Sequence, residues 1–207
     1  YAVNFCGDTE LHRVRRSTRP RFPISMADID KLYEKAEKYL QKQKFESALE
    51  TYQEIYRYQP NEEDVLLNLG DLSLKLNRTA EGVRYQTQLI DLYLKRNDTT
   101  KALAACRKIL KAAPQDVNAL MKLAGLQEKS RKNTEALEAY REALALHRKA
   151  NATAQVIECL QGIVRLDPAN TDANGELGDE AVKARQTKIA TGAYLRAAEL
   201  VRTTGQE

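Results

Sequence analysis

Apolar side chains recur at helical spacing along the chain from Met26 onward, and polar or proline breaks divide this pattern into short segments. Such an alternation predicts a succession of antiparallel helices joined by tight turns. The predicted helices span about residues 26–42, 45–58, 62–76, 79–96, 99–112, 116–131, 133–150, 153–166, 171–185 and 188–203. The pattern therefore indicates an all-α protein of ten helices.

The sequence repeats itself with a period of 54 residues. Pro60, Pro114 and Pro168 mark this period, and KALAACRKILKAAP at 101–114 matches QVIECLQGIVRLDP at 155–168. A fixed period of this kind is the signature of a solenoid, in which units pack on their neighbours and together present a surface. The next short helix would begin at Glu207, so the C-terminus is interpreted as a truncation or, alternatively, as a docking edge.

Polar residues near the breaks are candidates for helix capping. Ser25 followed by Asp28 is typical of a helix N-terminus. Thr79, Thr99 and Thr153 come just after breaks, where a hydroxyl can accept a hydrogen bond from an exposed amide. Asn-x-Thr triplets begin at residues 77, 97 and 151, and capping explains them better than glycosylation because two of them occupy one repeat position.

Aligned on the prolines, the chain resembles the tetratricopeptide repeat family, whose unit is a helix–turn–helix of about 34 residues. Six windows between about 29 and 204 match the small and large positions of that unit. Gly70 and Gly178 would let helices approach closely, and Tyr140 and Tyr194 would fill the space beside them. The windows overlap, so two long helices belong to two units each and the period contains three helices, as in a recurrent bacterial variety of these arrays.

This resemblance implies a right-handed superhelical solenoid over residues 26–207 that acts as a scaffold for protein–protein interaction and has no catalytic activity. In the family, partners usually lie in a concave groove lined by the first helix of each unit. Carried over position by position, the groove residues are Tyr33, Glu37, Asp64, Leu67, Asn68, Asp71, Asn118, Met121, Lys122, Asp172 and Asp179.

The charge of these positions bears on the partner. Some family members clamp acidic chaperone tails with lysine and asparagine, but the corresponding positions hold Tyr33 and Glu37, then Leu67 and Asp71. Carboxylates there would repel an acidic tail, so the resemblance implies a basic or mixed-charge protein or peptide. Solvation of helix starts by these acids is an equally good explanation of their presence.

Residues 1–25 lack periodicity and are expected to form a flexible basic tail, with a true start at Met26 as the alternative interpretation. Five arginines against Asp8 and Glu10 give this segment +3 of the formal charge of +4. The run RVRRSTRPR at 13–21 could contact phosphates, but it lacks interleaved aromatic residues, so a nucleic-acid role is disfavoured.

Candidate chemistry is sparse. Cys6, Cys106 and Cys159 show no metal-ligand spacing, and Cys106 replaces larger core residues of other copies, so it is predicted to pack in the core of a cytoplasmic protein. His147 is likewise predicted to be a packing residue. The sequence has no nucleophile motif, phosphate loop or metal motif, and no cofactor or membrane span is expected. Two alternatives remain open: self-association of solenoid ends, or membership of a larger bacterial regulator or enzyme.

Overall fold

The structure is a computed structural model that describes residues 25–205, and these residues form ten α-helices. The helices are α1 (Met26–Gln41), α2 (Phe45–Tyr58), α3 (Glu63–Lys75), α4 (Thr79–Lys95), α5 (Thr99–Ala112), α6 (Val117–Lys129), α7 (Asn133–Lys149), α8 (Thr153–Leu166), α9 (Thr171–Lys183) and α10 (Thr187–Thr204). All ten predicted helices are confirmed, with ends that differ by no more than two residues. Predictions about residues 1–24, including Cys6 and the arginine run, lie outside the described residues.

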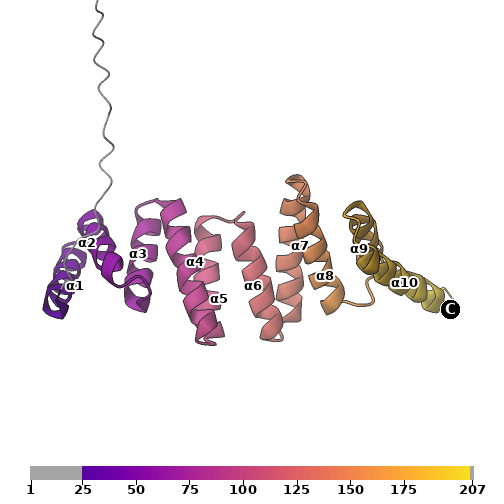
Figure 1. The fold of residues 1–207 in the computed structure, drawn as a ribbon, viewed down its shortest axis with the longest axis horizontal. Coiled ribbons are helices and arrows are strands. Elements are labelled where there is room, and N and C mark those ends of the chain that lie inside the picture. Colours follow the sequence, from indigo (N-terminus) through magenta and orange to yellow (C-terminus); the bar gives the residue numbers. More distant parts are fainter. Residues whose placement is uncertain (1–24, 206–207) are drawn as a thin grey trace, which may run out of the picture.

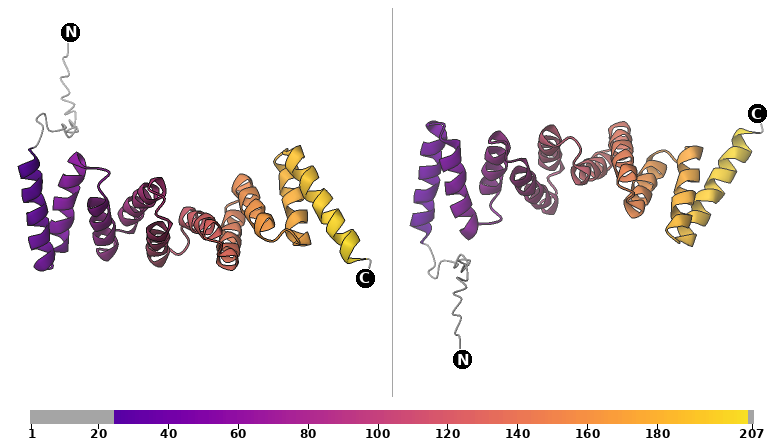
Figure 2. Two further views of the ribbon diagram at one scale, coloured as in Figure 1. Left: turned by 90° about the horizontal axis from the view of Figure 1, so that it is seen from below. Right: turned by 90° about the horizontal axis from the view of Figure 1, so that it is seen from above.

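Each helix packs mainly against the helices before and after it in the chain, which makes the molecule an elongated row (Figure 1). Consecutive helices zigzag between two layers (Figure 2). Ion pairs between helices two apart fit this arrangement: Asp71 on α3 pairs with Lys108 on α5, and Asp91 on α4 pairs with Lys122 on α6. The prediction of an antiparallel α-solenoid is therefore confirmed.

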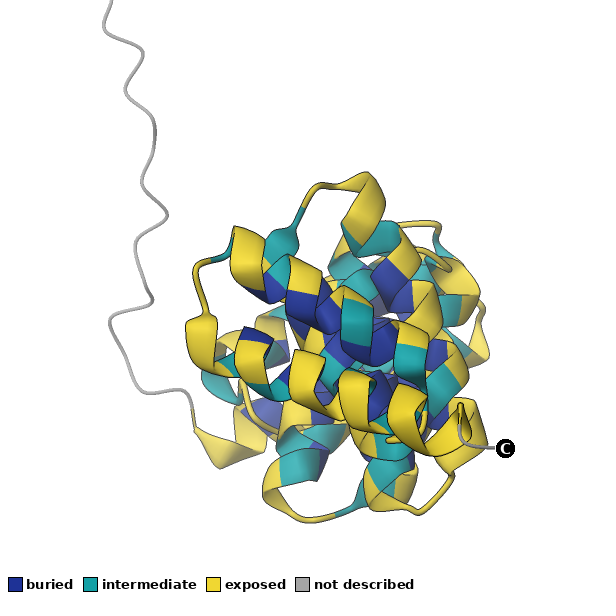
Figure 3. Ribbon diagram, turned by 90° about the vertical axis from the view of Figure 1, so that its right-hand side faces the viewer, coloured by how far each residue is buried: buried dark blue, intermediate teal, exposed yellow. Residues whose placement is uncertain are grey.

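The core runs along the middle of the row. Buried residues face the space between the layers, and exposed residues cover the outside (Figure 3). Leu49, Leu66, Leu89, Ile109 and Leu160 are among the largest side chains with almost no exposure. Burial of such side chains contributes about 1.5–3 kcal/mol each, so a single continuous core stabilises the array. No helix among residues 25–205 is long and apolar enough to cross a membrane.

Six of the nine turns end a helix in the same way, with a non-glycine residue at positive φ. These residues are Gln43, Asn77, Asn97, Arg131, Asn151 and Arg185, with φ between 54° and 58°. At the first Asn, the Asn77 amide donates to the Leu74 carbonyl and the Arg78 amide donates to the Ser73 carbonyl. This pair of hydrogen bonds is the Schellman motif, which satisfies carbonyls left open at a helix end. The three asparagines thus cap helix C-termini.

The predicted threonine caps are wrong at all three positions, each by one residue. Thr79, Thr99 and Thr153 are the first residues of α4, α5 and α8 and not their caps. The preceding residues Arg78 and Ala152 make no side-chain cap, whereas Asp98 accepts from the Lys101 amide. The Schellman turn contains one more residue than the sequence pattern predicted. Each threonine is therefore the first residue of its helix. The Ser25 cap is confirmed, since its hydroxyl accepts from the Asp28 amide.

The remaining three turns contain the repeated prolines. Pro60, Pro114 and Pro168 follow residues whose backbone has left the helical region, with ψ of 69°, 80° and 76°, since the ring of a proline disfavours helical backbone in its predecessor. The helices across these turns share fewer contacts than helices across the Schellman turns. The prolines therefore separate α3–α5 from α6–α8, and each of these groups is one complete period.

Candidate protein-binding surfaces

The first candidate surface is a hollow between α3 and α5, with α4 as its floor. We call it the α3–α5 hollow. Its inner part, of about 90 Å³, has Leu89 and Tyr93 on the floor and Leu67 and Ala104 on the walls. Its outer part, of about 400 Å³, is lined by Asp71, Leu74, Asn77, Thr79, Lys108, Lys111 and Ala112. The hollow thus combines an apolar floor with charged walls, as protein-binding sites commonly do.

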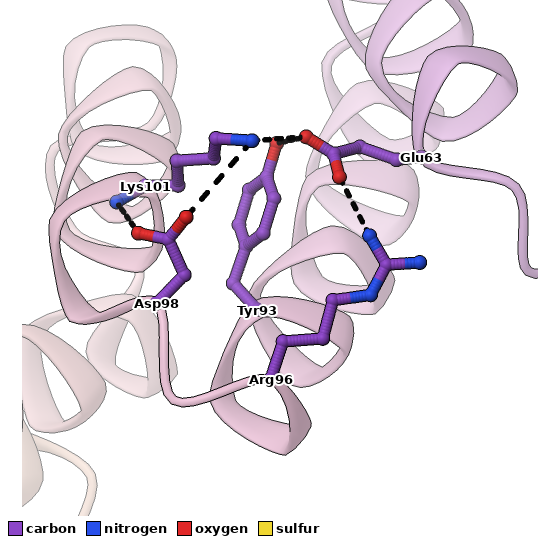
Figure 4. Close-up of polar contacts among 5 residues, drawn as sticks. All are labelled: Glu63, Tyr93, Arg96, Asp98 and Lys101. Atoms are coloured by element: carbon purple, nitrogen blue, oxygen red, sulfur yellow. Dashed lines mark hydrogen bonds and ion pairs between the residues drawn. The ribbon is translucent and has the colours of Figure 1, made fainter.

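Glu63 holds one end of this hollow together (Figure 4). Its carboxylate accepts hydrogen bonds from Lys101 Nζ at 2.7 Å, Arg96 Nη1 at 2.7 Å and Tyr93 Oη at 3.1 Å. The hydrogen bond from Lys101 is the main reason that the pKa of Glu63 lies below its usual value. Burial, followed by the hydrogen bond to Glu63, raises the pKa of Tyr93 to about 12. At neutral pH Glu63 is therefore ionised and Tyr93 is neutral. Their hydrogen bonds hold the walls and the floor of the α3–α5 hollow in place.

Asp71 and Lys108 form a bridge across the middle of the hollow. Lys108 Nζ lies 2.7 Å from Asp71 Oδ2, and the buried amide of Gln86 donates to Asp71 Oδ1 at 2.8 Å. Gln86 stands beside Gly70, where an added Cβ would lie 2.6 Å from the amide nitrogen. The glycine therefore makes room for the side chain that orients Asp71.

The second candidate surface occupies the equivalent place one period later. The α6–α8 hollow, of about 470 Å³, is lined by Met121, Lys122, Gly125, Tyr140, Glu158, Gln161 and Arg165. The floor is Tyr140 of α7, whose ring covers Gly162, where an added Cβ would lie 2.7 Å from Tyr140 Cζ. The pattern of two walls and a central helix is thus repeated with different side chains.

A bidentate ion pair closes one side of the α6–α8 hollow. Arg165 donates from Nε at 2.5 Å and from Nη2 at 2.9 Å to the two carboxylate oxygens of Glu128, and Tyr140 Oη donates to the same group at 3.0 Å. The hydrogen bonds from Arg165 lower the pKa of Glu128, and burial raises the pKa of Tyr140 to about 12. Bidentate geometry fixes orientation as well as charge, so this wall is well defined.

The structure does not bring the predicted groove residues onto one surface. Leu67 and Asp71 line the α3–α5 hollow, whereas Met121 and Lys122 line the α6–α8 hollow. Three helices per period are an odd number, so equivalent helices fall in opposite layers of a two-layer row. Although α3 and α6 are equivalent helices of the repeat, they pair in different directions along the chain. Asp71 on α3 forms an ion pair with α5, whereas Lys122 on α6 forms an ion pair with α4.

The other predicted residues are spread over α1, α3, α6 and α9. Tyr33 is half-buried and donates to Gln59 Oε1, Asp179 accepts from Tyr194 at 2.6 Å, and the Asn68 amide donates to a backbone carbonyl of its own helix. Four residues are exposed and make no side-chain hydrogen bond with the described residues: Glu37, Asp64, Asn118 and Asp172. Several predicted ligand groups are thus already satisfied within the chain.

Sequence reasoning missed the walls supplied by the third helix of each period. These residues are Lys101, Ala104 and Lys108 on α5, and Glu158, Gln161 and Arg165 on α8. The repeated stretches at 101–114 and 155–168, which form α5 and α8, could have indicated these walls. In a period of three helices, the third helix must lie beside the first and share a surface with it.

Cys106 and Cys159 are buried free thiols, as predicted for Cys106. Burial raises the pKa of each to about 11, so both are protonated at neutral pH and poorly nucleophilic. Residues 25–205 contain no group of three or more His, Cys, Asp or Glu placed to hold a metal ion.

Comparison with known proteins places these features among helical repeats. The family model described as tetratricopeptide repeat matches residues 33–86 and 87–152. No curated protein matches the chain.

Three solved structures illustrate the likeness. MamA 41-end from Desulfovibrio magneticus RS-1 is 21% identical over 86% of this chain and 98% of that chain, with a TM-score of 0.30. The TPR2B domain of yeast Sti1, in a structure titled as a pHsp70 complex, is 17% identical over 69% and 98%, with a TM-score of 0.39. A putative kinesin light chain from Podosopora anserina is 14% identical over 87% and 98%, with a TM-score of 0.37.

Proposed function

The chain belongs to the tetratricopeptide repeat family, and from that premise we propose that it is a non-catalytic scaffold that holds segments of a partner protein in its α3–α5 and α6–α8 hollows. The observation that carries the proposal is the recurrence of one design. Each hollow has a central helix as floor and an ordered ion pair on its walls. A preformed site of this kind binds with little loss of side-chain freedom.

The walls favour a partner of mixed charge. Asp71 and Lys108 offer both signs side by side, and the α6–α8 hollow carries Glu158 and Lys122, of which Lys122 is paired with Asp91. A bound segment carrying both charges can exchange for the Asp71–Lys108 pair without leaving either charge unpaired. This agrees with the sequence-based expectation of a basic or mixed partner, and it disfavours a purely acidic tail at these two sites.

The absence of catalysis is part of the proposal. The two described thiols are protonated at neutral pH, and Tyr93 and Tyr140, which line the two hollows and have raised pKa values, are held neutral. A reducing, cytoplasmic setting fits the free thiols of Cys106 and Cys159.

The test uses tryptophan to block each hollow without disturbing the core. Gly125 lines the α6–α8 hollow and has no atom within 4 Å of an added Cβ, and Ala104 is an exposed wall residue of the α3–α5 hollow. We propose affinity capture with mass spectrometry on wild type, Ala104→Trp and Gly125→Trp, with Ala154→Trp as control. Ala154 is exposed on α8 and lines neither hollow.

We expect wild type and Ala154→Trp to recover the same partner, and at least one blocking variant to lose it. Equal recovery by all four proteins, each with wild-type helical circular dichroism, would contradict the proposal.

Self-association is a second candidate, favoured by one observation. Leu195 and Val201 of α10 and Val182 of α9 are 60%, 58% and 56% exposed. Exposed apolar side chains of this kind can contribute to contact between two copies. Light scattering over a range of concentrations decides: a constant mass of 23.4 kDa excludes this function, and a rising mass that returns to 23.4 kDa in Leu195→Glu supports it.

A further inference from the structure

A third hollow lies between α8 and α10, with α9 beneath it, and differs from the other two in its charge. The α8–α10 hollow has a volume of about 650 Å³. Its lining residues are Gln161, Val164, Arg165, Pro168, Leu177, Lys188, Ile189, Gly192, Ala193 and Arg196. The lining thus contains apolar side chains and three cations but no carboxylate. A volume of this size is typical of ligand-binding pockets.

The repeat supplies an internal comparison that shows what fits this place. Counted back by two periods of 54 residues, Val164 is equivalent to Tyr56 on α2 and Ala193 is equivalent to Tyr85 on α4. We call these three copies of the place the first, middle and last. Those two tyrosines pack edge to face, with ring centroids 5.6 Å apart, and Tyr56 Oη donates to Gln88 Oε1 at 2.9 Å. In the last copy smaller side chains stand at both positions, and the hollow of about 650 Å³ lies beside Val164 and Ala193, which are each 3% exposed. The middle copy, with Leu110 and Ala139, also lacks the rings, so the comparison shows that one copy of this place accommodates aromatic rings and not that their loss opened the hollow.

The charge of the rim is specific to the last period. In the middle period, the positions equivalent to Ile189, Gly192 and Arg196 are Glu135, Glu138 and Glu142. The rim of this place is thus acidic in the middle copy and cationic in the last copy. A cationic rim is consequently a property of the α8–α10 hollow and not a general feature of the repeat.

Two of the three cations have no carboxylate partner within residues 25–205. Arg165 is engaged by Glu128. Lys188 and Arg196, which are exposed, form no ion pair with a carboxylate of the described residues. Unpaired cations beside an apolar hollow attract carboxylates that neighbour an apolar anchor.

We propose, building on the scaffold function above, that the α8–α10 hollow binds an acidic peptide segment of a partner protein through one aromatic side chain. The aromatic ring packs in the α8–α10 hollow against its apolar lining, next to Val164 and Ala193, which are equivalent to Tyr56 and Tyr85. Flanking carboxylates of the peptide pair with Lys188 and Arg196. Aromatic anchors buried in a pocket commonly dominate the binding energy of such complexes.

This site is separate from the family positions at which an acidic tail was excluded. Those positions carry Tyr33, Glu37, Leu67 and Asp71 on α1 and α3. The proposed cations come from α10 instead, so the exclusion does not extend to them.

The probe is a fluorescein-labelled peptide, Glu-Glu-Phe-Glu-Glu with capped ends, measured by fluorescence polarisation on the whole chain. Two control peptides replace Phe by Ala, or every Glu by Lys. Binding of the first peptide is expected to weaken at least about tenfold between about 50 mM and about 500 mM salt, because partly exposed ion pairs are screened. Both control peptides are expected to bind at least about tenfold more weakly than the probe.

Protein variants locate the site. Gly192→Trp fills the hollow, and since an added Cβ at Gly192 meets no atom within 4 Å, the helix tolerates it. Thr191→Trp is the matched control, because Thr191 is the adjacent residue, is exposed and lies outside the lining. We expect Gly192→Trp and Lys188→Glu/Arg196→Glu each to lose at least about tenfold in affinity, and Thr191→Trp to bind as wild type.

Several results would overturn the proposal. They are no binding by wild type, equal binding of the Ala-substituted peptide, or unchanged binding by Gly192→Trp with wild-type circular dichroism. The scaffold function is tested separately, since Ala104→Trp and Gly125→Trp leave the α8–α10 hollow open. Loss of partner capture in those variants with intact peptide binding supports both proposals, whereas intact capture with intact peptide binding removes only the first.

Discussion

Lys108 on α5 and Asp71 on α3 are joined by an ion pair of 2.7 Å that crosses the α3–α5 hollow above α4. The pair divides the hollow into an inner apolar part and an outer polar part. Any segment that lies along the whole hollow must displace this pair or hydrogen bond to it. The pair therefore controls access more than it stabilises the fold.

Its contribution to stability should be small. The two side chains are 43% and 46% exposed, and ion pairs of this exposure contribute about 0–1 kcal/mol. We expect a double-mutant cycle of Asp71→Asn and Lys108→Met to give a coupling free energy below about 1 kcal/mol, falling with added salt. Urea unfolding of the four proteins measures it. A coupling above about 2 kcal/mol would show that the pair is structural.

Two helical glycines should respond in opposite ways to alanine. An added Cβ at Gly162 would lie 2.7 Å from the ring of Tyr140, which is 5% exposed and held by Glu128, so overpacking should cost about 1–3 kcal/mol. An added Cβ at Gly192 meets nothing within 4 Å, so Gly192→Ala should gain about 0.5–1 kcal/mol in helix propensity. Thermal unfolding of the two variants distinguishes them. Equal effects would contradict the packing described for Tyr140.

A buried asparagine should be improved by leucine. Asn174 has no exposure, its Oδ1 accepts no hydrogen bond, and the equivalent positions hold Leu66 and Leu120. Its Nδ2 donates to the carbonyls of Asn170 and Pro168, and the Asn170 carbonyl would keep the Asn174 backbone amide as a donor after the replacement. An unsatisfied buried polar group costs about 1–3 kcal/mol, so Asn174→Leu should raise the free energy of unfolding by about 1–2 kcal/mol. The reverse change, Leu120→Asn, should lower it by more than about 2 kcal/mol. Denaturant midpoints of the two variants provide the check, and destabilisation by Asn174→Leu would refute this reading.

Glycine should stabilise the turn after α6. Arg131 has φ of 57°, a conformation that costs residues with a Cβ about 1–2 kcal/mol. After the greater entropy of glycine in the unfolded chain is subtracted, Arg131→Gly should gain about 0.5–1 kcal/mol. Arg141→Gly is the control, because Arg141 lies inside α7 and its replacement should lose about 1 kcal/mol. Similar losses in both variants would argue against the left-handed turn.

Acid should remove the contribution of Glu63. Hydrogen bonds, first from Lys101, hold its pKa below the ordinary 4.5. A carboxylate with a lowered folded-state pKa stabilises the fold above its unfolded-state pKa, and this contribution is lost as pH falls through the folded-state value. The stability difference between wild type and Glu63→Gln should therefore be largest above pH 4.5 and shrink in acid. Glu50→Gln, at an exposed position without an ion pair to the described residues, is the matched control.

The sequence alone determined the helices, their boundaries and the period, because these depend on interactions within a few residues. Apolar spacing fixed each helix, Ser25 and Asp28 fixed the first start, and the prolines fixed the junctions between periods. Core positions such as Cys106 and Gly70 were also predictable, since the repeat shows several versions of the same place. Only the left-handed turns shifted the expected threonine caps by one residue.

Only the tertiary structure decided which of these positions share a surface. Asp71 and Lys108 are far apart in the sequence and meet because α3 and α5 lie in one layer. Met121 and Lys122 fall on the other layer because three helices per period exchange the layers at each repeat. Ion pairing then satisfied groups that the sequence offered as ligands, and the packing of α8, α9 and α10 left the α8–α10 hollow between them. These outcomes depend on packing between helices that are not neighbours in the chain, which no local pattern records.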